Sequence, residues 1–234
     1  MTEQRRVALV TGTTGELGAT IAGRLAQDGY EVVGLDLKEP ASGGPARYYR
    51  CDLSDINALG ATLQRIRTDV GPIRLLVNNA AYYKATPFWE LTAEQIRTTL
   101  AVNVTALIYA CQQAALQMRE AGGGAIVNMA SIGGQGGGSS QIDYGASKAG
   151  VISVTATLGR LLAEYGIRVN AVAPAMIDAG MGKQLPPAVK ERYLSSTPMK
   201  RAAQPIEIAN VVAFLASEAA SYMTGATVNV NGGM

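Results

Sequence analysis

The sequence predicts an α/β fold: a doubly wound, parallel β-sheet of about seven strands with helices on both faces. Two observations support this prediction. Short β-branched runs alternate with longer helical patterns along the chain, as in repeated strand–helix–strand units. Several of these runs are almost purely apolar, which is typical of strands covered by helices on both sides. Because crossovers between parallel strands are right-handed, the expected arrangement is of the Rossmann type.

The expected elements follow from the same patterns. The strands are Val7–Thr11, Glu31–Asp36, a weak strand at 46–50, Arg74–Asn78, Ala125–Ala130, Arg168–Ala173 and Thr227–Asn231. The helices cover 16–28, 55–69, 93–120, 143–165 and 205–217. No linker long enough to divide the chain and no internal repeat is present, so we expect residues 1–234 to form one domain.

Composition excludes several classes of function. The net charge is +2 and no cluster of basic residues forms a stripe, so a nucleic-acid partner is not expected. No run of 18 or more apolar residues is present, so we expect no membrane span. The polar start of the chain lacks the apolar core of a signal peptide. The two cysteines, Cys51 and Cys111, have no metal or redox spacing, which favours a reducing cytoplasm.

Histidine is absent from the chain. This excludes nucleophilic catalysis by Ser-His or Cys-His pairs and metal sites built on imidazole. We therefore expect no metal at the site, and acid–base chemistry must come from another side chain.

A glycine-rich turn follows the first predicted strand and opens a helix, with the sequence Thr11-Gly12-Thr13-Thr14-Gly15-Glu16-Leu17-Gly18. Glycines allow a tight turn and let backbone N–H groups approach a pyrophosphate at the helix N-terminus. Asp36 closes the second strand about 20 positions further on, where a carboxylate would bind an adenosine ribose. Alone, Asp36 could be a turn residue. Together with the glycines it predicts a dinucleotide site.

Tyr144 and Lys148 lie four residues apart on a predicted helix, so their side chains share one face. An ammonium ~4 Å from the phenol, at an effective dielectric of ~20, would supply about 4 kcal/mol. That is enough to lower the pKa of Tyr144 by ~3, into the range of a general acid or base. Ser131 follows a strand at the ligand-binding edge of the sheet. Taken singly, the Tyr144–Lys148 pair could arise by chance, and Ser131 could be a capping or turn residue.

The order of these motifs resembles the single-domain branch of the short-chain dehydrogenase/reductase family. The resemblance covers essentially the whole chain, and its tail is similar to that of 3-oxoacyl-(acyl-carrier-protein) reductase-like members. Each motif alone is common, but the combination is specific. It rests on the glycine-rich turn, Asn78-Asn79-Ala80, Asn103, Ser131, Tyr144-x-x-x-Lys148, Pro174 and the segment from Ser221 to Gly233.

The resemblance implies an oxidoreductase that transfers a hydride between NAD(H) and a secondary alcohol or ketone. Tyr144 would be the general acid/base and Ser131 would hold the substrate oxygen. Asn103 would support a water-linked proton relay through Lys148, which also binds the nicotinamide ribose. The residues implied for cofactor binding, besides Tyr144 and Lys148, are Gly12, Thr14, Gly15, Leu17, Gly18, Asp36, Asp52, Leu53, Asn79, Ala80, Pro174 and Ile177.

Four residues depart from the family pattern: Glu16 within the turn, Ala81 after Ala80, and Ala175 and Ala179 near the nicotinamide. We expect Glu16 to face the like charge of the pyrophosphate, so that Glu16→Gln tightens NAD binding a few-fold. The alternative is that Glu16 points into solvent.

The resemblance also implies the surroundings of the substrate, which would be a small molecule. The side chains expected there are mostly apolar or neutral, which favours a neutral alcohol or ketone. Residues 180–198 are expected to form a lid, and the glycines at 133–138 with Ser139 and Ser140 a connector or a wall of the site. The residues expected near the substrate are Tyr82, Tyr83, Ile132, Gln141, Met176 and Met181.

Cofactor choice, assembly and function class complete the expectations. NAD is expected because Asp36 would repel the 2′-phosphate of NADP. A homotetramer or homodimer is implied, built on the helices that carry Asn103 and Tyr144. Two alternatives stay open: an NADP-dependent 3-oxoacyl reductase, and a non-catalytic nucleotide-binding regulatory protein.

Overall fold

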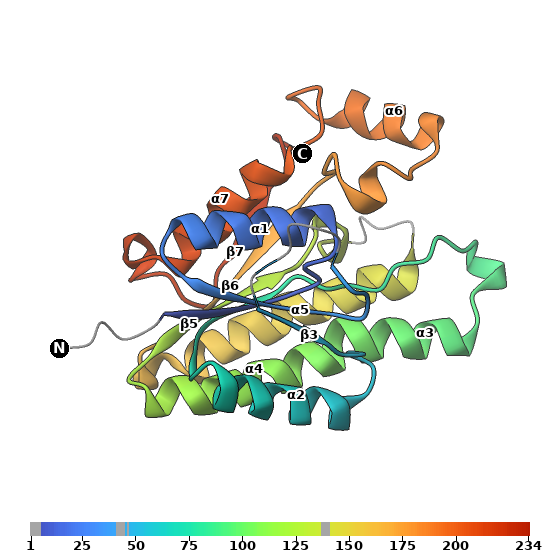
Figure 1. Ribbon diagram of the computed structural model, residues 1–234. Coiled ribbons are helices and arrows are strands. Elements are labelled where there is room, and N and C mark those ends of the chain that lie inside the picture. The colour runs from blue at the N-terminus through green and yellow to red at the C-terminus, as the bar shows by residue number, and fades with distance from the viewer. Residues whose placement is uncertain (1–5, 41–44, 46, 137–140) are drawn as a thin grey trace.

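The computed structural model of the protein describes residues 6–40, 45, 47–136 and 141–234 (Figure 1). Its centre is a seven-stranded sheet of order β3-β2-β1-β4-β5-β6-β7 in which every neighbouring pair is parallel. The predicted fold class is therefore confirmed. The strands are β1 Val7–Thr11, β2 Glu31–Asp36, β3 Arg47–Arg50, β4 Ile73–Asn78, β5 Gly124–Met129, β6 Ile167–Pro174 and β7 Thr227–Val230.

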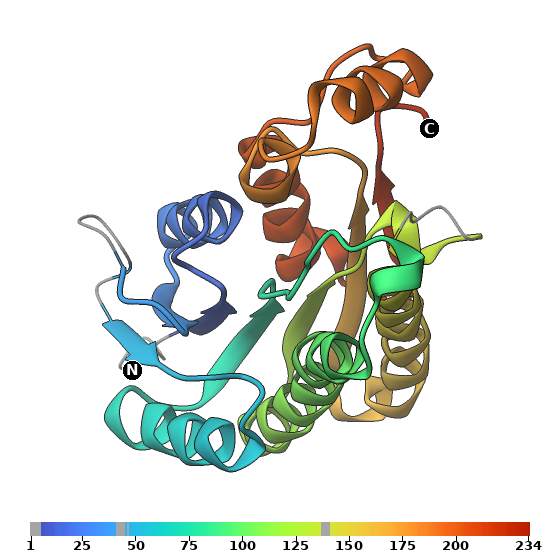
Figure 2. The same cartoon turned by 90° about the vertical axis from the view of Figure 1, so that its right-hand side faces the viewer.

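Helices cover both faces of this sheet, and Figure 2 looks along the layers toward the carboxyl ends of the strands. Helices α1 and α7 lie on one side, and α2, α4 and α5 on the other. Each layer buries its own apolar cluster against the sheet. The α-helices are α1 Glu16–Gln27, α2 Ile56–Asp69, α3 Ala93–Leu100, α4 Ala106–Glu120, α5 Ile142–Leu161, α6 Pro187–Ser196 and α7 Pro205–Ala216. Short helical turns lie at Phe88–Glu90, Ala101–Thr105, Ile132–Gly134, Ala163–Tyr165, Gly180–Gly182 and Glu218–Ala220.

Most predicted boundaries agree with the structure to within one or two residues, and three differences are larger. The expected helix 93–120 is divided into α3 and α4 by a π-helical turn at Ala101–Thr105. The expected helix 143–165 ends at Leu161 and is followed by the short turn Ala163–Tyr165. Helix α6 lies inside the expected lid, where no helix was predicted.

The stretch Ala93–Glu120 is long and apolar enough to cross a membrane by length and composition. Its α4 part packs against α2 and β4. The side chains that it contributes to the core cluster are Ala106, Leu107, Ala110, Cys111, Ala114, Ala115 and Met118. It is a core helix of the fold.

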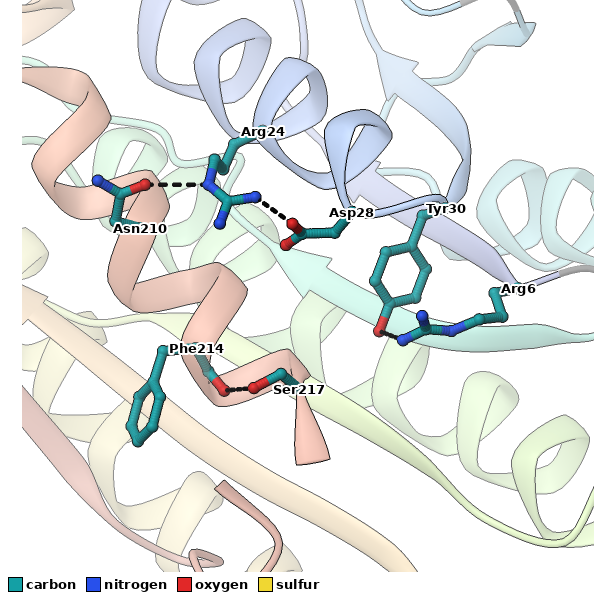
Figure 3. A network of polar contacts seen from close by, with 7 residues as sticks. All are labelled: Arg6, Arg24, Asp28, Tyr30, Asn210, Phe214 and Ser217. Atoms are coloured by element: carbon teal, nitrogen blue, oxygen red, sulfur yellow. Dashed lines mark hydrogen bonds and ion pairs between the residues drawn. The ribbon is translucent and has the colours of Figure 1, made fainter. Parts of the chain in front are cut away.

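Polar contacts join the two helices of the other layer. The Arg24 side chain of α1 donates from Nε to Oδ1 of Asn210 on α7 at 3.0 Å, and its guanidinium pairs with Asp28 (Figure 3). Further along the same layer, Arg6 Nη2 donates to the Tyr30 hydroxyl at 2.8 Å. The Arg24–Asn210 hydrogen bond thereby connects α1, the helix that follows the glycine-rich turn, to α7.

Candidate active site

The glycine-rich turn packs tightly at two of its glycines and is open at the third. Gly12 has φ of +76°, and a Cβ on Gly18 would lie 2.0 Å from the Gly12 carbonyl oxygen, so both positions require glycine. A Cβ on Gly15 would meet only the Gly12 oxygen, at 3.6 Å. Gly15 caps α1 without a side-chain hydrogen bond, and the first-turn amides of a helix lack intrahelical acceptors. The open space beside these amides fits a pyrophosphate.

Asp36 both lines the cavity and holds the turn in place. Its Oδ2 accepts hydrogen bonds from Thr14 N at 2.9 Å and Thr14 Oγ1 at 2.8 Å, and its Oδ1 accepts from Leu37 N at 2.7 Å. The carboxyl end of β2 is thus tied to the turn after β1. The Asp36 carboxylate lines the part of the cavity in which the sequence predicts the adenosine ribose.

Asn79 and Ala80 fasten the end of β4 to the same turn. Their backbone amides both donate to Thr11 Oγ1 at 3.0 Å, and Asn79 Nδ2 donates to the Thr11 carbonyl at 3.0 Å. Three strand ends therefore meet at one point of the sheet edge, where Rossmann-type folds bind their ligands.

The glycine-rich turn, Thr11 to Gly18, is called the cradle below. The same cavity also contains Tyr144, Lys148 and Ser131. Burial raises the pKa of Tyr144 to about 12, and a hydrogen bond with the Ser131 side chain opposes that rise. Burial lowers the pKa of Lys148 to about 8. The Lys148 Nζ lies 5.6 Å from the centre of the Tyr144 ring and donates to the Met129 carbonyl at 2.6 Å.

The predicted lowering of the Tyr144 pKa by Lys148 is therefore wrong. An ammonium about 4 Å from the phenol, in a medium of effective dielectric about 20, would lower this pKa. The larger effect in the structure is the cost of burying a phenolate, which favours the neutral phenol. Tyr144 is accordingly protonated at neutral pH and is ready to act as an acid.

Asn103 lies in the π-helical turn and is buried. Its side chain accepts from Tyr82 N at 2.7 Å and donates to the Tyr82 carbonyl at 3.0 Å and to Ser147 Oγ at 3.0 Å. Ser147 Oγ donates in turn to the Tyr144 carbonyl at 2.7 Å. Asn103 thus connects the loop after β4 to the helix that carries the tyrosine, and its role in a proton relay stays a prediction.

Glu16 does not point freely into solvent. Its Oε1 forms an ion pair with Lys183 Nζ at 2.6 Å, and its Oε2 accepts from Gly180 N at 3.0 Å. The ammonium holds the pKa of this carboxyl below its usual range. This contact was not predictable from sequence patterns, because its partners are 167 positions apart along the chain.

One cavity of about 460 Å³ joins these groups. Most of the predicted site residues line it, but Thr14, Asp52, Leu53 and Asn103 do not. Asp52 instead accepts from Ser54 N and Oγ, both at 2.8 Å. The predicted residues that line the cavity are Gly12, Gly15, Leu17, Gly18, Asp36, Asn79, Ala80, Ser131, Tyr144, Lys148, Pro174 and Ile177.

The substrate half of the cavity matches the expected surroundings in part. Tyr83 lies edge-on to Tyr144, with ring centres 5.3 Å apart. Ile132, Met176 and Met181 line the cavity, whereas Tyr82 and Gln141 do not. Residues 137–140, part of the expected connector or wall, lie outside the described residues. Lining residues that the sequence did not indicate include Leu185, Val189 and Tyr193 from the segment around α6.

A Rossmann-type sheet whose dinucleotide cradle shares one cavity with a tyrosine, a lysine and a serine defines a nicotinamide-dependent oxidoreductase. Comparison with known proteins agrees. The family model described as "Enoyl-(Acyl carrier protein) reductase" matches residues 12–234. The chain is 38% identical to acetoacetyl-CoA reductase of Rhizobium meliloti, over 97% of this chain and 98% of that protein. It is 35% identical to the 3-oxoacyl-[acyl-carrier-protein] reductase MabA of Mycobacterium bovis, over 98% and 92%.

A solved structure agrees as well. The ligand-free aldohexose dehydrogenase of Thermoplasma acidophilum superposes with a TM-score of 0.89 at 29% identity, covering 98% of this chain and 93% of that one. The chain belongs to the short-chain dehydrogenase/reductase family, and it is an oxidoreductase that acts on an alcohol or a ketone with a nicotinamide cofactor.

Proposed function

We propose that this protein is an NAD-dependent dehydrogenase/reductase that interconverts a neutral secondary alcohol and its ketone. One observation supports this most strongly: the Tyr144 and Ser131 side chains lie in the same cavity as the glycine-rich cradle and Asp36. A proton-transfer group and a nucleotide site so close together suit hydride transfer coupled to proton transfer.

Each residue of the site has a distinct role in the proposed reaction. The bound nicotinamide would supply or accept the hydride. Tyr144 donates its phenolic proton to the carbonyl oxygen during reduction and takes it back during oxidation. Ser131 holds the same oxygen by a hydrogen bond. Lys148, whose Nζ lies 5.6 Å from the centre of the Tyr144 ring, would bind the nicotinamide ribose. Because burial favours the protonated phenol, reduction suits neutral pH and oxidation is favoured as pH rises.

Asp36 supports NAD over NADP. The 2′-phosphate of NADP would bring about two negative charges next to this carboxylate. Lys148 is the one basic residue among the described residues that line the cavity, and it belongs to the catalytic half. Two basic residues lie near Asp36, Lys38 in sequence and Arg50 as its register partner on β3, and neither lines the cavity.

The substrate half of the cavity supports a neutral substrate. The lining there is apolar or uncharged, with the phenols of Tyr83 and Tyr193 as further polar groups. A second candidate, an NADP-dependent 3-oxoacyl reductase, is favoured by the full-length similarity to 3-oxoacyl and acetoacetyl-CoA reductases. A non-catalytic regulatory protein is disfavoured, because Asn103, Ser131, Tyr144 and Lys148 are all present.

Assembly and organisation are part of the proposal. Residues 1–234 would act as one domain, with 180–198 as a lid over the substrate. Helices α4 and α5 expose apolar side chains, among them Ile108, Leu116 and Leu161, beside a groove of about 540 Å³. This surface supports a homodimer or homotetramer. The two cysteines are free and buried, which supports a cytoplasmic enzyme.

The test is a substrate panel. The purified protein is assayed for NADH formation with neutral secondary alcohols, including sugars and short hydroxy esters. In the other direction it is assayed for oxidation of NADH and NADPH by 3-oxoacyl thioesters. Turnover of a neutral alcohol with NAD supports the proposal. Turnover confined to thioesters with NADPH selects the second candidate, and no turnover in any arm contradicts both.

A further inference from the structure

Glu16 connects two parts of the site that are distant in sequence. It is the first residue of α1, and the neighbouring Gly15, Leu17 and Gly18 line the cofactor half of the cavity. Both of its carboxylate oxygens are engaged: Oε1 by Lys183 Nζ at 2.6 Å and Oε2 by Gly180 N at 3.0 Å. Gly180 and Lys183 stand at the start of the lid.

The lid contributes much of the substrate wall. Met181, Leu185 and Val189 line the cavity with apolar side chains, and Tyr193 on α6 adds a phenol. Its far end is fixed to the body by Met199 N, which donates to the Gly232 carbonyl at 3.1 Å. The position of the first half of the lid therefore decides how this wall faces Tyr144.

The lid has few other polar ties to the body of the protein. Within the described residues, the hydrogen bonds of segment 180–196 stay within residues 179–200, except the two to Glu16. Helix α6 has no buried residue of its own. Packing therefore holds this segment only weakly. The two contacts of Glu16 should contribute more to the position of the lid than an isolated surface ion pair contributes to stability.

We infer that Glu16 is a positioning residue for substrate binding, which fastens the lid to the cofactor cradle and so couples the two halves of the site. The inference rests on the proposed function, in which segment 180–198 covers the substrate. The coupling between cofactor binding and lid closure should be positive. A pyrophosphate at the cradle places further negative charge near the Lys183 ammonium, so each event favours the other. The same ammonium offsets part of the repulsion expected between Glu16 and the cofactor.

The first measurement does not need activity. Limited trypsin digestion, followed by mass spectrometry, measures cleavage after Lys190 and Arg192 in α6. We compare wild type with Glu16→Gln, which keeps the size of the side chain but removes its charge. Lys183→Arg keeps the charge and serves as the conservative rescue. The matched control is Glu120→Gln, which breaks a surface ion pair with Arg67 at 2.6 Å, made from the end of α4.

We expect cleavage in α6 to be several-fold faster in Glu16→Gln, and saturating NAD to reduce the difference. Lys183→Arg and Glu120→Gln should behave like wild type. Raising the salt concentration should move wild type toward the variant, because salt screens the exposed pair. Equal cleavage rates in Glu16→Gln and wild type would overturn the inference, even if the protein turned over no alcohol.

The second measurement concerns turnover with whichever substrate the panel identifies. A lid held in the wrong place weakens substrate binding more than chemistry, so the KM for the substrate should rise several-fold in Glu16→Gln with kcat within about two-fold of wild type. Faster cleavage with an unchanged substrate KM would also overturn the positioning role. If the panel finds no substrate, the proposed function fails, and the digestion still decides whether Glu16 fastens this segment.

Discussion

Lys148 donates a hydrogen bond of 2.6 Å from Nζ to the backbone carbonyl of Met129, at the end of β5. This bond ties a buried ammonium to the strand that leads into Ser131. Burial lowers the pKa of Lys148 to about 8, whereas in the unfolded chain the same group has its ordinary pKa of 10.5. Folding stability must then depend on pH through this residue.

The sign follows from proton uptake. Between about pH 8 and pH 10.5 the unfolded chain binds more protons than the folded protein, so wild type gains stability as pH rises through this window. The gain is at most roughly 3–4 kcal/mol, at ~1.4 kcal/mol per pH unit. Lys148→Met lacks the titrating group. We expect the difference in unfolding free energy, wild type minus variant, to increase toward alkaline pH.

Urea denaturation without cofactor, near neutral pH and again near pH 10, measures this difference. Lys38→Met, which removes an exposed ammonium, is the control and should follow wild type at both pH values. If the wild type and Lys148→Met change in parallel, the lysine is not titrating in the folded protein as its burial requires.

Tyr144→Phe tests proton transfer. The substitution keeps the ring, and with it the edge-on contact with Tyr83, but deletes the hydroxyl. We expect kcat to fall at least ~100-fold, the low end of what general acid–base catalysis contributes. NAD affinity, measured by calorimetric titration, should stay nearly the same. Tyr83→Phe is the matched control, since it removes a phenolic hydroxyl from the same cavity, and near-normal turnover by Tyr144→Phe would exclude the mechanism.

Asp36 is expected to set cofactor preference. Repulsion of the 2′-phosphate should make kcat/KM for NAD at least ~10-fold higher than for NADP, or roughly 1.4 kcal/mol. Asp36→Asn removes the charge but can still accept from Thr14, so the preference should shrink while the cradle stays folded. Asp28→Asn, at the other end of α1, should leave the ratio unchanged. Equal kcat/KM values for the two cofactors in wild type would refute this assignment.

Local motifs explain why so much of the site was predictable. The cradle, Asp36 and the Tyr144–Lys148 pair are each set by spacing within one turn, strand or helix, and strand–helix alternation determines which edge they share. Seven predicted site residues of these motifs line the cavity for that reason: Gly12, Gly15, Leu17, Gly18, Asp36, Tyr144 and Lys148. Strand positions were predictable because their apolar runs are buried on both faces.

The features that sequence did not reveal depend on contacts between distant segments. The π-helical turn that divides 93–120 accommodates Asn103, whose amide is matched to the Tyr82 backbone. Helix α6 has no buried face and so no apolar period to find. The Glu16–Lys183 pair joins residues 167 positions apart. The pKa of Tyr144 depends on the depth of burial, which no spacing of residues encodes.

The exposed face of α4 and α5 leads to the last prediction. Ile108 is 44% exposed and Leu116 41%, and both line a groove that also contains Leu158 of α5 and is largely apolar. Such a patch on a free surface favours association, and two copies of one chain can bury it symmetrically. We expect light scattering coupled to gel filtration to show a dimer or tetramer for wild type. Leu116→Lys should shift it toward smaller species, because a charge buried in the apolar contact would be unpaired.

The control is Phe214→Lys on α7, a side chain 43% exposed on the opposite layer of the fold. A wild type that is monomeric at micromolar concentration, or a Leu116→Lys variant that stays fully assembled while Phe214→Lys dissociates, would show that α4 and α5 do not form the main contact between copies.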